Sequence, residues 1–374
     1  MDRLQTSVAV TRFPGRYIQG PHACGVIPRL AEELQVHKPA VICDAFVAAN
    51  ILPNHLAPVL TSLQPLYLTF GGEVTHEEVA RLVAAGKHEK CDMIIGIGGG
   101  KTVDVSRAVA FESGRLPVIA ISTLASTDAP CSARVVFYTP DGRFESYRDL
   151  PSNPTAVIMD TEILIKAPVR FLVAGIGDAL STWFEAESCA KVHAPNCTGF
   201  RSGMSAVHLA RCCYDSLFEY GEEAVLSAKR GVITPAFEHI VETNTLLSGI
   251  GFESCGLAAA HAIHNGLSEF HCTHSFQHGE KVNIGTLASL FLTNKPKAEI
   301  DKVYRFCKAV GLPITLAQLG FADPLPPDTI RMIGQHTCVT GSTIYNEDPA
   351  ISPAAVSAAV AMADEYGKKI LAEH

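Results

Sequence analysis

The segment Met93–Thr102, with the sequence MIIGIGGGKT, decides the fold. Its apolar first half predicts a buried strand, its glycines predict a tight turn, and the apolar spacing over Val103–Phe111 predicts a following helix. Glycines at the start of a helix let the backbone approach a ligand, and the free N–H groups there favour an anion. The segment therefore predicts an α/β domain with a phosphate-binding loop.

The glycine turn departs from the two common phosphate-binding motifs. The P-loop G-x-x-x-x-G-K-[ST] would require glycine where Ile95 stands. The dinucleotide motif G-x-G-x-x-G, counted from Gly96, would need its last glycine at Lys101. A merely tight turn between strand and helix is the alternative to phosphate binding.

Around this segment, short apolar runs alternate with helical patterns, including one over Glu77–Ala85. This alternation predicts a parallel sheet covered by helices, with ligands at the carboxyl ends of the strands. The predicted strands are Ala40–Cys43, Leu66–Phe70, Met93–Ile97, Val118–Ile121 and Ala156–Asp160.

From about Ala167 the chain becomes rich in alanine and leucine with helical periodicity. We therefore expect an α/β domain over residues 1–166 and an all-helical domain over residues 167–374. The predicted helices of the second domain are Phe171–Ala190, Ser202–Tyr220, Pro235–Ser248, Gly256–Leu267, Lys297–Val310 and Pro353–Ala372.

Composition and charge favour a soluble protein with a sizeable core. The 374 residues are 47% hydrophobic and 18% charged, and the formal net charge is −8. An acidic chain without a basic run is a poor candidate for nucleic acid or anionic membranes. No apolar run approaches the roughly 18 residues that span a bilayer, no signal peptide is visible, and twelve scattered cysteines fit a reducing compartment. We expect a cytoplasmic protein.

Asp44 directly follows the predicted strand Ala40–Cys43. A carboxylate at this end of a strand can accept hydrogen bonds from both ribose hydroxyls of adenosine and would repel a 2′-phosphate. Capping of a helix is the alternative role. Together with the glycine turn, Asp44 favours NAD over NADP.

Five histidines fall within eighteen residues, which favours a divalent metal. Two of them, three residues apart on a predicted helix, share a face. The residues alone do not say which histidines bind the metal. Asp178 is a candidate further ligand in an otherwise apolar helix start, and a helix cap is its alternative role. The histidines are His261, His264, His271, His274 and His278.

Six blocks in order along the chain resemble the glycerol dehydrogenases, a zinc-dependent branch of the iron-containing, or group III, alcohol dehydrogenases. They span essentially the whole chain, so the resemblance is specific to that branch. The blocks are Gly98–Asp104, Ser126–Ser132, Gly175–Leu180, Gly251–Ser254, Ala258–Gly266 and His278–Val282.

The resemblance implies the dehydroquinate synthase-like fold, with an NAD-binding α/β domain and a helical metal- and substrate-binding domain. It implies an oxidoreductase that converts glycerol and related 1,2-diols to ketones such as dihydroxyacetone, with NAD and one zinc per subunit. The zinc ligands would be Asp178, His261 and His278, and Thr182 stands where iron-dependent relatives carry a further histidine. The family usually forms rings of eight subunits, so a homo-octamer is expected.

The resemblance also places the NAD contacts in the first domain. One of them, Arg134, departs from the leucine usual in the family, although a main-chain contact would survive. The implied contacts are Asp44, Gly99, Gly100, Lys101, Asp104, Thr123, Ser126, Ser132, Arg134 and Tyr138.

The implied substrate contacts are Asp128 and the metal-binding pair His261 and His278. His264 is a candidate proton relay, with a second-sphere hydrogen bond or ordinary packing as its alternative. Two departures lie near the metal helices: Cys255 replaces a glycine, which would alter the volume of the pocket, and Asn283 replaces an alanine.

Three alternative functions remain open from the residues. A glycerol-1-phosphate dehydrogenase or other polyol enzyme of the same fold would need a basic phosphate site, whereas the blocks around Asp128 and His261 supply carboxylate and amide groups. A P-loop hydrolase is disfavoured by Ile95. A non-catalytic NAD- or metal-binding regulator is disfavoured by the intact set Asp128, Asp178, His261 and His278.

Overall fold

A computed structural model describes residues 7–373 of the chain. These residues form two compact units. The α/β unit contains Arg12–Ala167 and Gly231–Ile233, and the helical unit contains the segment before Arg12, Pro168–Arg230 and the residues from Thr234 onward. The chain passes between the units more than once, whereas the sequence predicts a single boundary near residue 166.

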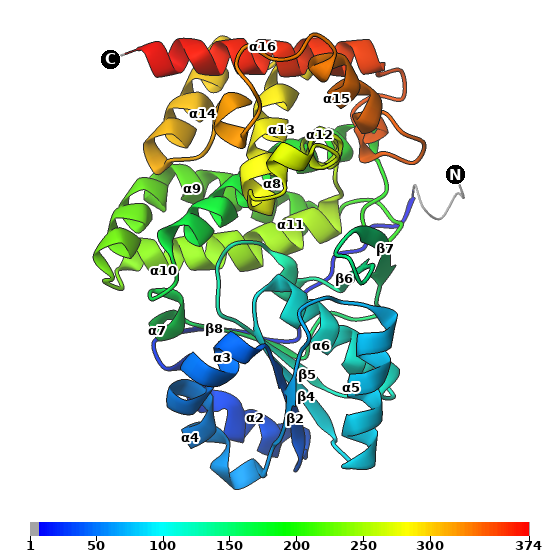
Figure 1. The fold of residues 1–374 in the computed structure, drawn as a ribbon, viewed down its shortest axis with the longest axis vertical. Helices are drawn as coiled ribbons and strands as arrows, with labels where there is room; N and C mark the ends of the chain where they lie inside the picture. Colours follow the sequence, from blue (N-terminus) through cyan, green and yellow to red (C-terminus); the bar gives the residue numbers. More distant parts are fainter. Residues whose placement is uncertain (1–6, 374) are drawn as a thin grey trace. The chain divides into compact units, whose positions relative to one another are not determined.

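The core of the α/β unit is a six-stranded parallel sheet. In spatial order its strands are β1 (Tyr17–Gly20), β8 (Ala156–Asp160), β5 (Val118–Ser122), β4 (Met93–Gly98), β2 (Pro39–Cys43) and β3 (Leu66–Thr69) (Figure 1). The four central strands are buried along their whole length because Val, Ile and other small or apolar residues face helices on both sides. All five predicted strands are present, and the α/β fold class is confirmed.

Three strands escaped prediction from the sequence. The edge strand β1 is half-buried and has no alternating pattern. The strands β6 (Arg134–Tyr138) and β7 (Phe144–Asp149) form a separate antiparallel hairpin. The sequence of β7, FESYRD, is mostly polar and exposed, so no apolar alternation marks it as a strand.

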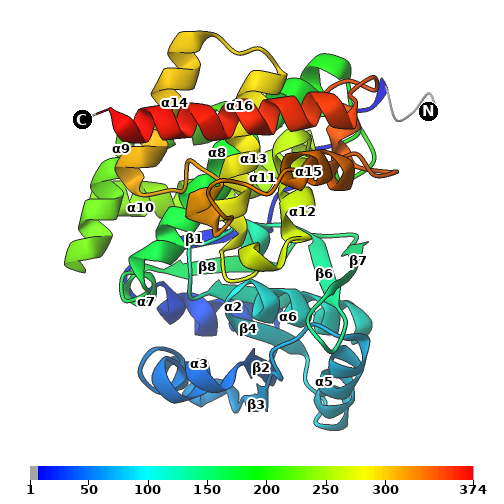
Figure 2. The ribbon, with the colours of Figure 1, turned by 45° about the horizontal axis from the view of Figure 1, so that its top comes forward.

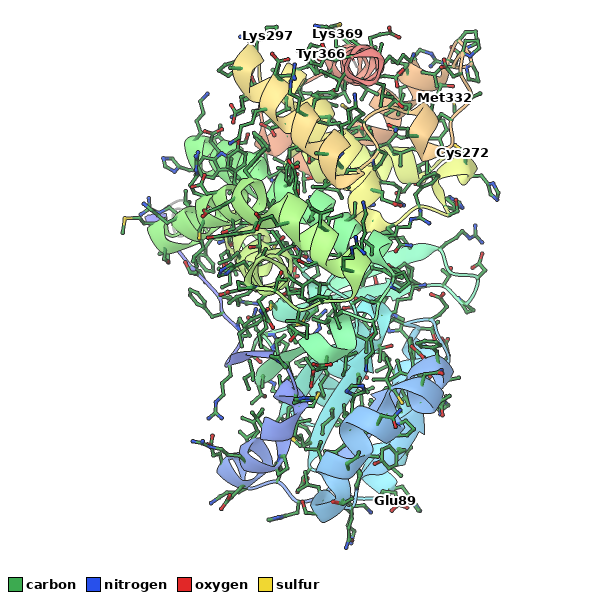
Figure 3. The ribbon with its side chains drawn as sticks, turned by 90° about the vertical axis from the view of Figure 1, so that its left-hand side faces the viewer. Glu89, Cys272, Lys297, Met332, Tyr366 and Lys369 are labelled. Atoms are coloured by element: carbon green, nitrogen blue, oxygen red, sulfur yellow. The ribbon has the colours of Figure 1, made fainter. Side chains whose placement is uncertain are left out.

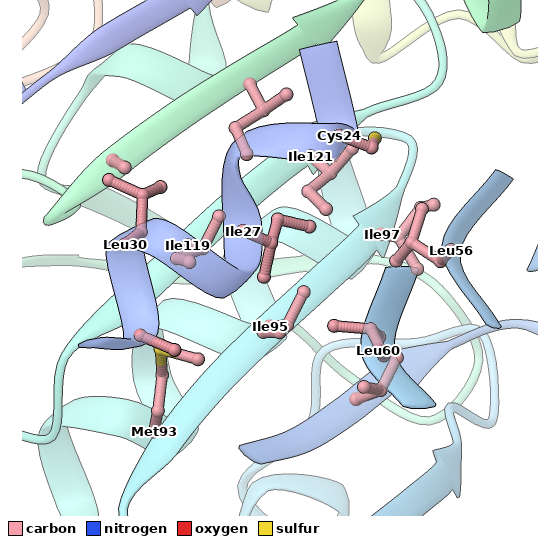
Figure 4. Packing of buried hydrophobic residues seen from close by; sticks show 14 of the residues in the cluster. Cys24, Ile27, Leu30, Leu56, Leu60, Met93, Ile95, Ile97, Ile119 and Ile121 are labelled. Atoms are coloured by element: carbon pink, nitrogen blue, oxygen red, sulfur yellow. The ribbon is translucent and has the colours of Figure 1, made fainter. Parts of the chain in front are cut away.

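Helices cover both faces of the sheet. Ile27 and Leu30 pack against Ile95 and Ile119 on one face, as Figure 4 shows. The strand residues between these, such as Ile94, point to the opposite face of the sheet and pack against a second layer of helices. The first layer contains α2 (Ile27–Leu34), α3 (Ala45–Asn50) and α4 (Ala57–Leu60), and the second contains α5 (His76–His88) and α6 (Gly100–Glu112).

The strand order places a topological switch point between β2 and β4. The strand that follows β2 is its outer neighbour β3, whereas the strand that follows β4 is β5, on the opposite side. Open parallel sheets bind ligands where successive connections diverge in this way. Asp44 follows β2, and the glycine turn follows β4.

The helical unit packs around two buried helices, α8 and α13. Figure 2 shows α16 lying across α13 and α15, which it contacts. Its helices are α8 (Val169–Val192), α9 (Met204–Arg230), α10 (Pro235–Glu242), α11 (Ser248–Cys255), α12 (Ala259–Ser268), α13 (His278–Leu292), α14 (Lys297–Val310), α15 (Thr329–Thr337) and α16 (Pro353–Ala372).

Several helix bounds differ from those predicted. The predicted helix Pro235–Ser248 is α10, which continues through a π-helical turn over Thr243–Leu247 into α11. Gly256 ends α11 with a φ of 100°, so α12 begins at Ala259 and not at Gly256. The helices α13 and α15 were not predicted.

Among the described residues, no single helix has the length and apolar character needed to cross a bilayer. The bent pair formed by Pro235–Cys255 and Ala259–Ser268 meets those criteria only when the two parts are taken together.

Candidate active site

The helices α8 and α13 touch backbone to backbone beside the candidate metal ligands. A Cβ atom on Gly279 would lie 1.8 Å from the carbonyl oxygen of Ala174, and one on Gly177 would lie 2.5 Å from that of Gly279. Only glycine fits at such an approach. The contact brings Asp178, the residue after Gly177, next to His278, the first residue of α13.

Asp178, His261 and His278 converge on one point of the helical unit. One ligand atom from each lies within 4.8 Å of the others. The Nε2 atom of His278 lies 3.2 Å from Oδ1 of Asp178, and Nε2 of His261 lies 3.6 Å from the same oxygen. The Asp178 side chain is 1% exposed and that of His278 is 39% exposed, so solvent reaches the group from the His278 side.

The carboxylate of Asp178 has the electrostatics of a cation ligand. Neither of its buried oxygens accepts a hydrogen bond of ordinary geometry from the described residues. Burial by itself would raise the pKa of Asp178, but the rings of His278 and His261 outweigh burial and lower the pKa from its usual value. Because a buried carboxylate that accepts no hydrogen bond is costly, the group fits a bound cation. One carboxylate and two imidazoles suit Zn²⁺ or Fe²⁺.

Glu185 is a buried residue of this region that the sequence analysis missed. Its Oε2 atom lies 2.7 Å from Nδ1 of His261. Glu185 follows Asp178 by seven residues, which is two turns along one face of α8. Two acidic residues at this spacing on one face of the helix are the signal that would have found it.

His264 lies beside the three-residue group and hydrogen-bonds to one of its members. Its Nε2 atom is 3.0 Å from Nδ1 of His278, and its Nδ1 atom is 3.1 Å from Oδ1 of Asn265. Burial, and then the neighbouring His278 ring, lower the pKa of His264 well below its usual value. A neutral His264 with Nδ1–H bonded to Asn265 accepts a hydrogen bond from His278, which leaves Nε2 of His278 facing Asp178.

The other two histidines of the cluster lie away from this group. His271 and His274 are exposed in and after the short turn His271–Thr273, and their ring centroids are 5.2 Å apart. Nε2 of His274 is 3.1 Å from the carbonyl oxygen of Ser268. Figure 3 labels Cys272 of this turn at the edge of the helical unit.

The glycines at the end of β4 and the start of α6 differ in what surrounds them. A Cβ atom on Gly96 would lie 2.2 Å from Oγ of Ser106, and one on Gly98 would lie 2.5 Å from Oγ1 of Thr102, so both are needed for packing of α6. A Cβ atom on Gly99 would make only an ordinary contact, and one on Gly100 would meet nothing within 4 Å. The backbone of Gly99 and Gly100, at the start of α6, is therefore open to the approach of a ligand.

Lys101, the next residue, is held by a carboxylate and an aromatic ring. Its Nζ atom lies 2.6 and 2.7 Å from the two carboxylate oxygens of Glu73 and 4.7 Å from the centroid of the Tyr138 ring. Two of the implied NAD contacts, Lys101 and Tyr138, therefore meet beside the glycine turn. Glu73 was not identified from the sequence.

Asp104 has an internal structural role, whereas the resemblance implies contact with NAD. Its side chain is buried and pairs with Arg107, and Oδ2 accepts a hydrogen bond of 3.0 Å from the backbone N–H of Val136. Both carboxylate oxygens are thus engaged within the protein. A direct contact between Asp104 and NAD remains a prediction.

The remaining implied NAD and substrate contacts lie at Asp44 and on residues 123–134 of the α/β unit. Asp44 accepts a hydrogen bond of 2.9 Å from the backbone N–H of Val47, so it caps α3, as its alternative role predicted. Asp128 precedes the short turn Ala129–Cys131. The Arg134 side chain forms an ion pair with Asp149. Thr123, Ser126 and Ser132 are buried.

The two departures in the helical unit are both used in packing. Cys255 lies in a core cluster with Ala186, Ala206 and Ala210. The Nδ2 atom of Asn283 donates a hydrogen bond of 2.8 Å to the carbonyl oxygen of Pro313. Neither residue is among the three converging ligands, so the expected effect of Cys255 on pocket volume stays a prediction.

Comparisons with known proteins agree with this architecture. Residues 14–161 match the family described as iron-containing alcohol dehydrogenase. The glycerol dehydrogenase of Thermotoga maritima is 50% identical over 96% of this chain and 98% of its own length, and that of Citrobacter freundii is 47% identical over 97% and 99%. The solved structure of glycerol dehydrogenase from Schizosaccharomyces pombe superimposes with a TM-score of 0.91, at 38% identity, over 97% of this chain and 92% of that one.

Identity at this level over nearly the full length of both chains defines the class of protein. The chain belongs to the iron-containing alcohol dehydrogenase family, in the branch of the glycerol dehydrogenases.

Proposed function

We propose that the protein catalyses the reversible oxidation of glycerol by NAD⁺, which yields dihydroxyacetone, NADH and a proton. The observation that carries the proposal is the buried carboxylate of Asp178, whose oxygens accept no hydrogen bond of ordinary geometry from the described residues, between His261 and His278. Relatives that are 50% and 47% identical are glycerol dehydrogenases, which supports the same substrate here.

Zinc is the metal that we propose for the site. Asp178, His261 and His278 supply three protein ligands and leave a position open, as in catalytic zinc sites. Thr182, one turn after Asp178, supports a three-ligand set, because its hydroxyl lies 3.0 Å from Oγ of Ser248 in a buried contact. When bound, zinc supplies a Lewis acid that lowers the pKa of the reacting hydroxyl.

The α/β unit supplies the residues proposed to bind NAD. Gly99 and Gly100 leave the start of α6 open to the pyrophosphate, and Lys101, paired with Glu73, lies beside them. Asp44, at the switch point, would accept hydrogen bonds from the adenosine ribose and would disfavour the 2′-phosphate of NADP.

Side chains of this chain also orient the diol and its proton in the proposal. Asp128 would accept a hydrogen bond from a glycerol hydroxyl and so favour polyols over simple alcohols. His278 and His261 would hold the metal through Nε2, because their Nδ1 atoms face His264 and Glu185. His264 remains the candidate proton relay, next to the metal-binding ring of His278.

The proposal is tested by the absorbance of NADH formed from glycerol and NAD⁺ at alkaline pH. We expect turnover with glycerol and vicinal diols, loss of turnover after chelation and recovery with zinc. Turnover of glycerol 1-phosphate but not glycerol would favour the alternative polyol-phosphate enzyme. NAD binding without turnover of any diol would favour the regulatory alternative.

Assembly is a further part of the proposal. The resemblance implies eight subunits, and each subunit has a mass of 40.0 kDa. Light scattering of the purified protein would give about eight times that mass if the octamer forms and a smaller multiple if it does not.

A further inference from the structure

A single buried carboxylate organises the start of the helix that carries His261. Oε1 of Glu185 accepts hydrogen bonds from the backbone N–H groups of Ala258, at 2.8 Å, and His261, at 2.9 Å. Oε2 lies 2.7 Å from Nδ1 of the His261 ring. The Glu185 side chain is 1% exposed, so all three contacts are shielded from water.

The backbone of α12 has no capping side chain of its own at this end. Ala258 is the residue before the helix and has no side chain that could accept a hydrogen bond. Glu185, which comes from α8, accepts these N–H groups in place of a local cap. The same carboxylate thus fixes both the backbone and the ring of His261.

We propose that Glu185 is a positioning residue that holds His261 as the Nδ1–H tautomer and directs its Nε2 lone pair toward Asp178. This inference rests on the proposed metal site. The Nε2 atom of His261 lies 3.6 Å from Oδ1 of Asp178, on the side of the ring opposite Glu185. Partners of this kind raise the basicity of a metal-binding histidine and fix its orientation.

The chemistry requires a carboxylate rather than another acceptor of the same size. A glutamate offers two acceptor oxygens, one for the backbone N–H groups and one for the ring N–H. A glutamine has one oxygen and one NH₂ group. In Glu185→Gln, an NH₂ group therefore faces either the backbone donors or Nδ1, and in the second arrangement the ring becomes the Nε2–H tautomer, which cannot bind a metal through Nε2.

Glu347 provides a matched control at the same helix start. Its Oε1 atom accepts a hydrogen bond of 3.2 Å from the backbone N–H of Ala259, and burial raises its pKa. No contact with the His261 ring is found for Glu347 among the described residues. Glu347→Gln therefore perturbs the start of α12 while it leaves the ring contact in place.

The experiment compares the wild type, Glu185→Gln, Glu185→Asp and Glu347→Gln. Each protein is freed of metal with a chelator, its thermal midpoint is measured, and zinc is titrated against a chromophoric chelator of known affinity. We expect Glu185→Gln and Glu185→Asp to bind zinc about 10- to 100-fold more weakly. The aspartate variant keeps the charge but is one methylene too short to reach all three donors, so it tests the geometry if the glutamine variant does not fold.

In Glu347→Gln the amide oxygen can still accept the N–H of Ala259, so zinc affinity should stay within about twofold of the wild type. Equal zinc affinities for the Glu185 variants and the wild type would overturn the positioning role, as would an equal loss in Glu347→Gln. Failure of the proposed function looks different, because the wild type itself would then bind zinc no better than His278→Ala, and the inference would fall with it.

Discussion

Asp104 and Arg107, three residues apart on α6, form an ion pair that is almost completely buried. The Arg107 guanidinium also donates hydrogen bonds to the carbonyl oxygens of Ala129, at 2.8 Å, and Arg134, at 2.7 Å. The pair therefore connects the glycine-turn helix to the segment that carries Asp128 and the implied NAD contacts. Its role is to hold that segment in place.

We expect Asp104→Asn to lower the free energy of unfolding by about 3–5 kcal/mol, because it leaves Arg107 buried without a counter-charge. Urea unfolding of the metal-free protein measures the effect. In the double variant Asp104→Leu with Arg107→Met, the loss should be smaller than the sum of the two single losses. Weaker NAD binding in Asp104→Asn with unchanged stability would instead support a direct contact with NAD.

Gly100→Val should weaken NAD binding more than about tenfold and leave folding nearly intact, since a Cβ atom there meets nothing in the protein. Gly99→Val should act in the same direction. Gly96→Ala is the matched control, because its methyl group would clash with Ser106 and destabilise the unit by about 1–3 kcal/mol. Calorimetric titration with NAD and thermal unfolding separate the two effects. Unchanged NAD affinity in Gly100→Val would remove the glycine turn from the NAD site.

Asp44→Ser should reduce the preference for NAD over NADP, measured as the ratio of the two kcat/KM values, by about tenfold or more. Serine keeps a cap for α3 in place of the bond from Asp44 to Val47, so stability should change by less than about 1 kcal/mol. If the wild-type protein had equal kcat/KM values for NADP and NAD, Asp44 would not discriminate between the two cofactors at the adenosine ribose.

His264→Ala should retain zinc, since the ring lies outside the three-ligand group, although its affinity should fall by about tenfold because Nδ1 of His278 loses its acceptor. At saturating zinc, kcat should fall if His264 accepts the departing proton. Rates of glycerol oxidation at several zinc concentrations distinguish the two roles. An unchanged kcat at saturating zinc would leave only the second-sphere role.

The fold was largely predictable because its central strands are continuous apolar runs. A run such as β4 indicates a buried strand by itself, and the glycines after it require a turn. Elements whose stability depends on distant partners were not predictable. The polar strand β7 is stabilised by pairing with β6. The helix α13 is buried over most of its length and buries polar as well as apolar residues, so its sequence has no amphipathic period.

In the candidate site, too, residues in local sequence patterns were predictable and residues that act through distant contacts were not. The converging residues Asp178, His261 and His278 follow from the resemblance, and the histidine density alone indicated only that a metal was near. Glu185 and Arg107 act through contacts across 76 and 22 residues of sequence, respectively. No local pattern encodes such contacts, whereas Asp44 and the glycine turn are local features that the sequence displays directly.

The most direct test of the account is the zinc content of single histidine variants, measured by elemental analysis after dialysis. The wild type, His271→Ala and His274→Ala should hold about one zinc per subunit, because the two exposed histidines lie outside the converging group. His261→Ala and His278→Ala should hold almost none, since each loses one of three protein ligands. Zinc lost from His271→Ala or His274→Ala but retained by His261→Ala would contradict the central claim.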